Sequence, residues 1–435
     1  MRVSALALTG LCLLPAALAA QSGQSTARAV GMGRSMTASA RGYEAVVWNP
    51  ALLGAPGRPG FSINIVQAGA SSRSNVLSPS ELWQYYTQDS LTLEDKTAIL
   101  DKVRATDDST FGVGALGDVM ALGVTVGNFG VTLSGTAADA DVAVSDDAIE
   151  LVLLGSTGRR APGERYSAEG TRGAGVSAAT LAVAWGQGFR LPVGHLALGV
   201  TAKLRRGIFA AGGSDLGSYV QNAPDFDARA GAHAVYFDVD STLNNGTGFG
   251  LDFGAAYDFA SGVRIAAAVE NVVSSMSWKD ENLKYLREEY VLQQSADGLT
   301  YTSTTISDID GPYDSTDATQ RALRDSVLGT DPFATKLRVG AQLSAGPVLL
   351  AGDAVFELTD GIVPGASSRA SVGAELPLAV ILLRGGLATD FDGGVGFSAG
   401  LGFKFGPVRL DFGGALTPGG DRKGLTVATG LSVMN

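Results

Sequence analysis

Apolar and polar residues alternate one by one along much of this chain, and the alternation is clearest near its C-terminal end. Between 395 and 405 every odd position is apolar, while the even positions hold glycine, serine or lysine. Similar runs occupy 407–417 and 424–434, and Gly406 with Pro407 separates the first run from the second. Successive side chains of a β-strand point to opposite faces, so this period of two predicts strands with one apolar and one polar face.

The same alternation recurs upstream and predicts fourteen strands. They are 60–70, 112–126, 129–137, 174–186, 195–206, 248–259, 263–274, 335–345, 348–358, 368–376, 380–389, 395–405, 407–417 and 424–434. Many are about ten residues long, which suits strands that cross a bilayer with lipid on one face and a polar lumen on the other. Because lipid cannot hydrogen-bond an open sheet edge, the expected fold is all-β, a closed 14-stranded antiparallel transmembrane barrel.

Short and long connections alternate between the predicted strands. The long ones are 71–111, 138–173, 207–247 and 275–334. This asymmetry is typical of outer-membrane barrels, whose short turns are periplasmic and whose long loops are extracellular. Inside the long loops, the sequence predicts two short helices in 78–104 and further helices at 145–154, 280–294 and 317–328.

The N-terminal region divides into two parts. Residues 1–19 have the positive start, the uncharged apolar run and the A-x-A end of a signal peptide. Residues 20–58 are too short for a domain and too apolar to float freely, so we expect them to fill the barrel lumen as a hatch, or plug. Residues 59–435 would form the barrel. Within the hatch, a short helix should end near Trp48, because Pro50 disfavours helix at the residue before it.

The composition and net charge argue against several classes of function. The 435 residues carry a net charge of −11 at pH 7, which argues against nucleic acid as a partner. One cysteine and two histidines leave little material for a disulfide framework, a metal centre or a catalytic triad. We therefore predict that the protein is no enzyme and has no cofactor. The acidic stretch 308–317 reads as a solvated loop, with a cation site as the less favoured alternative.

Charged residues occupy the polar face of the predicted strands, where they should face the lumen. The residues assigned to the lumen are Lys203, Arg205, Asp252, Asp258, Arg264, Glu270, Arg338, Asp353, Arg384 and Asp411. Positive and negative charges are nearly balanced, which favours cross-strand pairing over ion selection.

Several segments resemble one superfamily of outer-membrane proteins. Residues 31–34 and 48–51 resemble the N-terminal hatch of FadL-like transporters. Residues 248–254 and 383–411 resemble the PorV-like and TraF-like branch of the same superfamily. Residues 91–96 and 123–133 are similar to an uncharacterised branch of it, a domain of unknown function. The resemblance implies a 14-stranded barrel with a lumenal hatch in the bacterial outer membrane. Such a barrel contacts outer-membrane lipid and is inserted by the barrel-assembly machinery.

The resemblance also implies what the protein does. Its FadL-like side implies gated, passive uptake of hydrophobic small molecules such as long-chain fatty acids, through a hatch that shifts. Its PorV-like side implies an accessory role in secretion or surface assembly, with a surface or secreted protein bound by the extracellular loops. A purely structural barrel is the third alternative. The residues assigned to the hatch and its gating are Gly31, Gly33, Arg34, Trp48, Asn49 and Pro50.

Overall fold

The computed structural model describes residues 25–435 except 157–159, 222–225, 239–242, 295–300, 360–367, 392–393 and 421–422. The predicted signal peptide, 1–19, lies outside the described residues.

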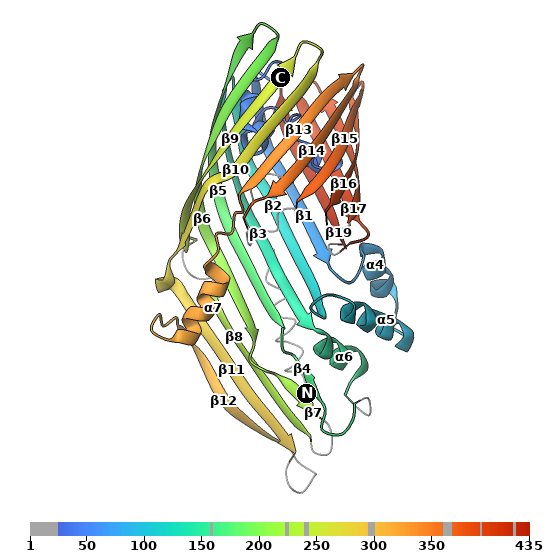
Figure 1. The fold of residues 1–435 in the computed structure, drawn as a ribbon, viewed down its shortest axis with the longest axis vertical. Helices are drawn as coiled ribbons and strands as arrows, with labels where there is room; N and C mark the ends of the chain where they lie inside the picture. The colour runs from blue at the N-terminus through green and yellow to red at the C-terminus, as the bar shows by residue number, and fades with distance from the viewer. Residues whose placement is uncertain are drawn as a thin grey trace.

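Fourteen strands of the described chain form a closed antiparallel barrel (Figure 1). They are β1 (Phe61–Ser74), β2 (Thr110–Val126), β3 (Phe129–Ser145), β5 (Arg172–Leu191), β6 (Gly194–Asp215), β9 (Gly246–Phe259), β10 (Val263–Trp278), β13 (Lys336–Ala345), β14 (Val348–Glu357), β15 (Arg369–Leu378), β16 (Ile381–Asp390), β17 (Val395–Phe405), β18 (Val408–Thr417) and β19 (Lys423–Met434). Each pairs with the next in this order, and β1 closes the barrel on β19, with Ile63 opposite Val433. The predicted fold class is confirmed.

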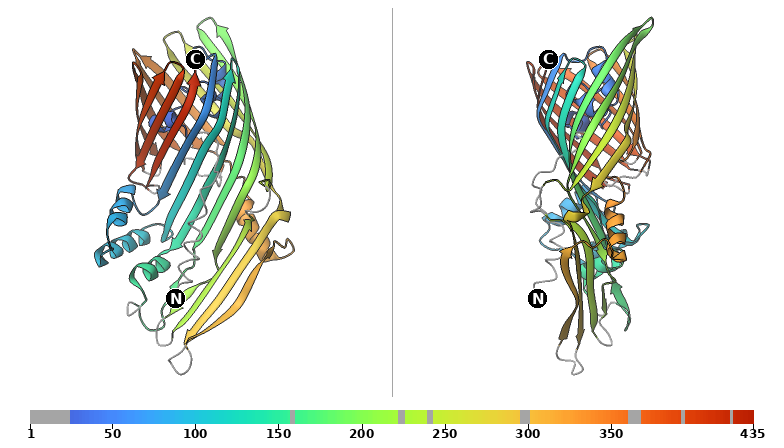
Figure 2. Two further views of the ribbon diagram at one scale, coloured as in Figure 1. Left: turned by 180° about the vertical axis from the view of Figure 1, so that it is seen from behind. Right: turned by 90° about the vertical axis from the view of Figure 1, so that its left-hand side faces the viewer.

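The wall of this barrel is uneven in height. Strands β13 to β19 have 10 to 12 residues, whereas β2, β3, β5 and β6 have 17 to 22 and continue beyond the barrel on the side of the long loops (Figure 2). There β6 pairs with β8 (Asp227–Phe237), β8 with β11 (Leu283–Gln294), and β11 with β12 (Tyr301–Pro312). Two three-residue strands extend this sheet: β7 (Tyr219–Gln221) pairs with β8, and β4 (Arg165–Ser167) pairs with β7. We call β4, β7, β8, β11, β12 and the projecting ends of β5 and β6 the extracellular sheet, because the pattern of short and long connections predicts that the long loops lie outside the cell.

The extracellular sheet corrects four sequence-based expectations, for three long loops and one helix. The predicted long loops 138–173, 207–247 and 275–334 contain strands, and the helix predicted at 280–294 is wrong: a single 3-10 turn, η2 (Asp280–Asn282), leads into β11. Alternate residues such as Leu283 and Tyr285 are buried in β11, and pairing on both edges satisfies its backbone, so tertiary pairing overrides the local helical preference.

The remaining helices agree with prediction. They are α4 (Pro79–Thr87), α5 (Leu93–Arg104), α6 (Asp146–Leu154) and α7 (Ala318–Leu328). Ser78 caps α4 and exchanges hydrogen bonds with Glu81, and Thr92 does the same for α5 with Asp95, so two donors at each helix start are satisfied locally.

The acidic stretch 308–317 is only partly a loop. Asp308 and Asp310 belong to strand β12, and Asp310 accepts a hydrogen bond of 2.8 Å from the Tyr236 hydroxyl. Among the described residues, no three His, Cys, Asp or Glu side chains are grouped so that they could hold a metal ion.

The outer surface of the barrel is apolar. Large side chains such as Phe253 on β9, Val339 on β13 and Leu401 on β17 are exposed at 36% or more, while the intervening residues point inward. At the short-turn end, exposed aromatic residues form a girdle: Phe129, Trp185, Phe189, Phe259 and Phe405. An apolar band bordered by aromatic residues is the surface that lipid requires of a spanning barrel. In the described part of the chain, no helix is long and apolar enough to cross a membrane.

The extracellular sheet has the opposite arrangement, with a conventional apolar core. Helix α7 packs on the face of the sheet that continues the inner face of the barrel. The buried members of this core are Val176, Ala210, Val235, Phe237, Trp278, Leu283, Tyr285, Leu323, Val327 and Leu328. A smaller cluster gathers α5 and the start of α4 around Val76, Leu77, Ile99 and Val103.

Candidate functional site: the filled bore of the barrel

Residues 25–55 lie inside the barrel, and we call them the luminal segment. They contain α2 (Ala27–Gly31), α3 (Tyr43–Trp48) and the 3-10 helix η1 (Pro50–Leu53). Every one of these residues is buried except Arg34 and Arg41, which are half-buried. The bore of this barrel is therefore filled by its own N-terminal chain.

Short elements with their own caps build the luminal segment. Thr26 caps α2 by accepting a hydrogen bond from the Ala29 amide at 3.2 Å. Asn49 caps η1 through the Ala51 amide at 3.1 Å, while its side-chain amide donates to the Thr37 carbonyl at 3.0 Å. Pro50 occupies the first position of η1, where its missing N–H costs nothing. Asn49 thus joins the first half of the segment, residues 25–41 with α2, to the second half, residues 42–55 with α3 and η1.

The first half of the luminal segment rests on the short side of the barrel wall. A Cβ atom on Gly31 would lie 2.8 Å from the Gly400 Cα, so the two backbones touch where neither residue has a side chain. Gly33 turns the chain at a φ of +61°, and a Cβ there would lie 3.1 Å from the Leu387 carbonyl oxygen. Wall glycines on four adjacent strands face this half: Gly373, Gly386, Gly400 and Gly413.

The second half rests on the tall side of the wall in the same way. A Cβ on Gly254 would overlap the Asn49 side chain, and one on Gly199 would overlap the Pro50 backbone. The wall glycines that face η1 and its ends are Gly186, Gly188, Gly199 and Gly254. The luminal segment therefore packs against two patches of wall glycines. This packing explains why glycine occupies these inward positions.

Buried charges join the first half to the wall. Arg28 of α2 pairs with Glu44 of α3 at 3.0 Å and with Glu375 of β15 at 2.9 Å. Glu375 also accepts from Arg384 of β16 at 2.9 Å, and Arg384 pairs with Asp411 of β18 at 2.6 Å. All five side chains are at most 7% exposed, so this network is shielded from water.

Two wall carboxylates hold other parts of the segment. One oxygen of Asp353 accepts the backbone amides of Met36 and Thr37 and the Thr37 hydroxyl, each at 2.8 Å. Asp118 accepts the Ser25 amide at 2.6 Å. These contacts fix the ends and the middle of the first half.

A separate network lies on the tall side of the wall. Lys203 pairs with Asp252 at 2.8 Å and with Glu270 at 3.4 Å, and Glu270 pairs with Arg338 at 2.7 Å. The Arg338 guanidinium also lies 4.8 Å from the centre of the Trp48 ring, which ties this network to the end of α3.

The remaining lumen-facing residues lie above and below that network. Arg205 donates to the Ser274 hydroxyl at 2.5 Å and stacks on the Phe333 ring at 3.9 Å. Arg264 pairs with Asp258 at 2.7 Å and donates to the Ala38 carbonyl of the luminal segment at 3.3 Å.

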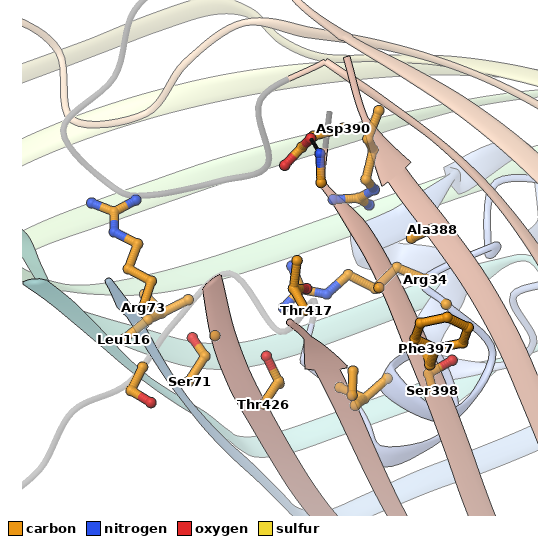
Figure 3. A pocket seen from close by; sticks show the side chains of 18 of the residues that line it. Arg34, Ser71, Arg73, Leu116, Ala388, Asp390, Phe397, Ser398, Thr417 and Thr426 are labelled. Carbon is orange, nitrogen blue, oxygen red and sulfur yellow. Dashed lines mark hydrogen bonds between the residues drawn. The ribbon is translucent and has the colours of Figure 1, made fainter. Parts of the chain in front are cut away.

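Two cavities lie at opposite ends of the luminal segment. The outer cavity, about 210 Å³, opens on the side of the long loops, where Arg34, Arg73, Arg369 and Asp390 line it together with apolar residues such as Leu116 (Figure 3). The inner cavity, about 430 Å³, lies on the side of the short turns and is bordered by polar residues and glycines, among them Gly54, Arg58, Asn128, Gln187 and His195. The luminal segment separates the two.

The structure therefore gathers the sequence-assigned hatch residues in two places. Gly31, Gly33 and Arg34 form one turn, with Arg34 at the outer cavity and at a φ of +63°. Trp48, Asn49 and Pro50 form the junction between α3 and η1.

Sequence reasoning missed the two buried charges of the segment, Arg28 and Glu44. The signal that could have found them is an arginine and a glutamate inside an otherwise apolar, small-residue stretch. Such a pair is stable there only with partners.

A closed barrel with an apolar, aromatic-bordered outer surface and a bore filled by its own N-terminal segment defines an integral β-barrel of the bacterial outer membrane. Residues 50–413 match the model of a family described as a family of unknown function, DUF5723. The chain belongs to this family. No curated protein matches the chain.

Solved structures with a similar course of the chain are outer-membrane barrels. The crystal structure of the Pseudomonas putida toluene transporter TodX is 10% identical, covers 95% of this chain and 99% of its own, and has a TM-score of 0.49. A Pseudomonas aeruginosa FadL homologue is 10% identical, with 94% and 97% covered and a TM-score of 0.43. Outer membrane phospholipase A from Escherichia coli is 11% identical, with 59% and 80% covered and a TM-score of 0.25.

Proposed function

We propose that this barrel takes up hydrophobic small molecules passively across the outer membrane, and that the luminal segment is the hatch that gates their passage. The observation that carries the proposal is the position of the segment between two cavities, one facing each side of the membrane. With the segment docked on both glycine patches, a solute has to displace part of it to pass.

The outer cavity supports amphipathic acids, such as long-chain fatty acids, as the substrate class. Three guanidinium groups and one carboxylate surround it, so its charge is positive on balance. The Nε atom of Arg369 is buried and has no hydrogen-bond partner among the described residues. Apolar atoms of Val30, Leu116 and Ala415 lie beside the charges. A carboxylate with a hydrocarbon tail matches both parts of this lining.

Movement of the first half of the segment is the simplest gate. It separates the outer cavity from the bore, and Gly33 and Arg34 at its turn have left-handed backbone conformations that constrain the turn. Its polar contacts with the wall, such as that of Arg28 with Glu375, can exchange for water when it moves. Its apolar contacts, such as that of Val30 with Ala428, would be replaced by the hydrocarbon part of the solute. The second half keeps its place on the other glycine patch.

A reversible crosslink tests this gate. The hydroxyls of Ser35 in the segment and Ser371 on β15 are 3.0 Å apart, so cysteines at both positions are within reach of a disulfide bond. The sequence holds one cysteine, Cys12, in the predicted signal peptide. Labelled oleate uptake would be measured in cells that lack other fatty-acid uptake and express the double variant S35C/S371C.

We expect oxidation to abolish uptake by the double variant and a reductant to restore it. The single variants S35C and S371C are matched controls, and each should take up oleate at the same rate with and without the reductant. Uptake by the oxidised, fully crosslinked protein at the reduced rate would contradict a gate in this half of the segment. Equal uptake with and without the protein, across acids and alkanes, would contradict transport altogether.

A second candidate function, an accessory role in secretion or surface assembly, is favoured by the edge of the extracellular sheet. Strand β12 pairs only with β11 among the described strands, and residues 302–306 on it are exposed. Residues 302–307 contain no charge and no proline, the features that normally protect a free edge. An extended segment of an exported protein could add to this edge as a further strand.

Shortening the β11–β12 hairpin separates the two functions. Removal of residues 289–306 takes away the outer part of the edge and leaves the bore untouched. If the accessory role holds, protease-accessible surface proteins decrease while oleate uptake is unchanged. If uptake is the function, surface proteins stay at the wild-type level. Heat-modifiable migration of the barrel on a gel checks that the variant is folded.

A further inference from the structure

Helix α4 carries a large apolar surface that the rest of the chain leaves uncovered. Trp83 is 68% exposed and Tyr86 84% exposed, and Leu82 beside them is also exposed. The rings of Trp83 and Tyr86 lie 6.4 Å apart, as expected of neighbours three residues apart on one helix face. On another side, Tyr85 packs toward the cluster that includes Val76 and Leu77. The helix is thus apolar on two sides, of which only one has a protein partner.

The connection to the barrel fixes where this surface lies. Strand β1 ends at Ser74, and α4 begins at Pro79. The Ser74 hydroxyl accepts the amides of Val76 and Leu77, each at 3.2 Å, and Lys423 of β19 donates to the Asn75 carbonyl at 2.7 Å. A short and internally bonded link therefore holds α4 at the outer rim, beside the ends of β1 and β19 (Figures 1 and 2).

At the outer ends of β18, β19 and β1, the described residues include no exposed aromatic side chain. Elsewhere around the outer rim, exposed phenylalanines stand at or near the strand ends: Phe249 on β9, Phe356 on β14, Phe391 after β16 and Phe397 on β17. At the corresponding ends of β18, β19 and β1 the exposed residues are Leu416, Leu425, Ala70 and Ser72. Aromatic girdles normally border both edges of the lipid-facing band. The described outer ends of β2, β3, β5 and β6 carry no exposed aromatic residue either, so α4 is attached at one edge of a wide sector in which the barrel wall does not supply the outer girdle.

We infer that α4 lies in the headgroup region of the outer leaflet, with Trp83 and Tyr86 completing the outer aromatic girdle over β18, β19 and β1. The partner of this surface is lipid, because the surface continues the apolar band of the barrel. Tryptophan and tyrosine suit the interface, since their rings are apolar and their N–H or O–H groups reach water. The single charged residue of α4, Glu81, is paired with Lys102 and with the Ser78 cap, so no unpaired charge opposes this position.

The four tryptophans of the chain provide the test, because they sample four environments. Trp48 lies in the bore, Trp185 in the girdle at the short-turn end, Trp278 in the core of the extracellular sheet, and Trp83 on α4. The full chain would be reconstituted in phosphatidylcholine nanodiscs, with and without bromine on the acyl chains, and acrylamide would be added separately. Comparing wild type with W83F, W185F and W278F isolates the emission of each residue.

We expect brominated lipid to quench Trp83 by about the same fraction as Trp185, with shallow bromines at least as effective as deep ones, and acrylamide to quench Trp83 less than a water-exposed indole. Trp278 should respond to neither lipid. Quenching of Trp83 by acrylamide together with no response to brominated lipid would overturn the inference. If W278F disturbs its core, the W83F and W185F comparison still decides the question, since both replaced side chains are exposed.

Discussion

The barrel and the extracellular sheet share strands, yet they bury opposite kinds of residue. Inside the barrel β6 buries Lys203 and Arg205, and it exposes Leu204, 66% of which is accessible. Farther along the same strand, after a register shift opposite Ser177, Ala210 is buried under α7. The alternation of the strand is the same in both regions. What differs is the solvent on each side, which is lipid outside the barrel and water around the extracellular sheet.

This difference means that the two regions owe their stability to different interactions. The barrel interior depends on paired charges whose removal leaves a partner uncompensated. The extracellular sheet depends on close packing between α7 and the strands, where the cost of a change follows the volume lost. Substitutions that change one kind of interaction at a time test whether the two regions are stabilised differently.

The largest effect should come from the buried network at the short side of the wall. Among the described residues, Arg384→Met leaves Glu375 with one ion-pair partner and Asp411 with none. We expect a loss of about 3–5 kcal/mol in the free energy of unfolding. Urea titration in detergent, followed by tryptophan emission, measures it. Lys404→Met is the matched control: this lysine is exposed near the short turns, and its loss should change little. Equal stability of the two variants would contradict a structural role for the network.

A charge on the lipid-facing side should lower the free energy of unfolding nearly as much as the loss of Arg384. Phe253→Arg places a cation in the middle of the apolar band and should destabilise the barrel by about 2–4 kcal/mol. The matched change in the extracellular sheet, Leu292→Arg on β11, should cost less than about 0.5 kcal/mol, because that side chain is exposed to water. Refolding into lipid vesicles from urea measures both, and similar costs would mean that the same solvent surrounds the two regions.

Truncation in the core of the extracellular sheet should have a smaller and local effect. Leu323→Ala removes a buried side chain of α7 and should cost about 2 kcal/mol, the lower end for such a change. Proteolysis from outside intact cells should then cut near α7 faster, whereas the barrel should keep its heat-modifiable migration. Loss of barrel folding in this variant would show that the two regions do not unfold separately.

The smallest effect concerns the pH response of α4. Partial burial raises the pKa of the Glu81 carboxyl, but hydrogen bonds from Lys102 and Ser78 outweigh it and lower the pKa from 4.5 to about 2. Because the folded-state pKa is depressed, the stabilisation is complete above about pH 4.5 and is lost as the pH falls toward about 2. It is modest, since both side chains are partly exposed.

A spin label at position 86 would report this response. In Y86C the label should become more mobile between about pH 4.5 and 2, and the additional change Glu81→Gln should remove that pH dependence. The same transition with and without Glu81 would assign the titration to another group.

The period of two was enough to predict the barrel, because each spanning strand meets the same two environments along its length. It did not predict β8, β11 and β12, which lie in water and have weaker alternation. In 280–294 the residues Leu283, Leu286 and Tyr290 also fit a helical spacing, and only pairing with β8 and β12 decides for a strand. Long-range pairing of this kind is not readable from one segment.

The candidate site was predictable in part for a similar reason. Gly31, Gly33 and the 48–50 junction stand out as a glycine-rich turn and a proline break. The docking positions on the wall do not, because an inward glycine such as Gly400 is a docking position only if a backbone lies against it. The wall partner of Arg28, Glu375 of β15, is likewise 347 residues away in the sequence.

The glycine patches also bear on how the molecule comes to be assembled. Each patch takes its glycines from neighbouring strands, β15 to β18 for one and β5, β6 and β9 for the other. Neither docking site exists until those strands have paired in register, so the luminal segment can take its final place only after that part of the wall has formed.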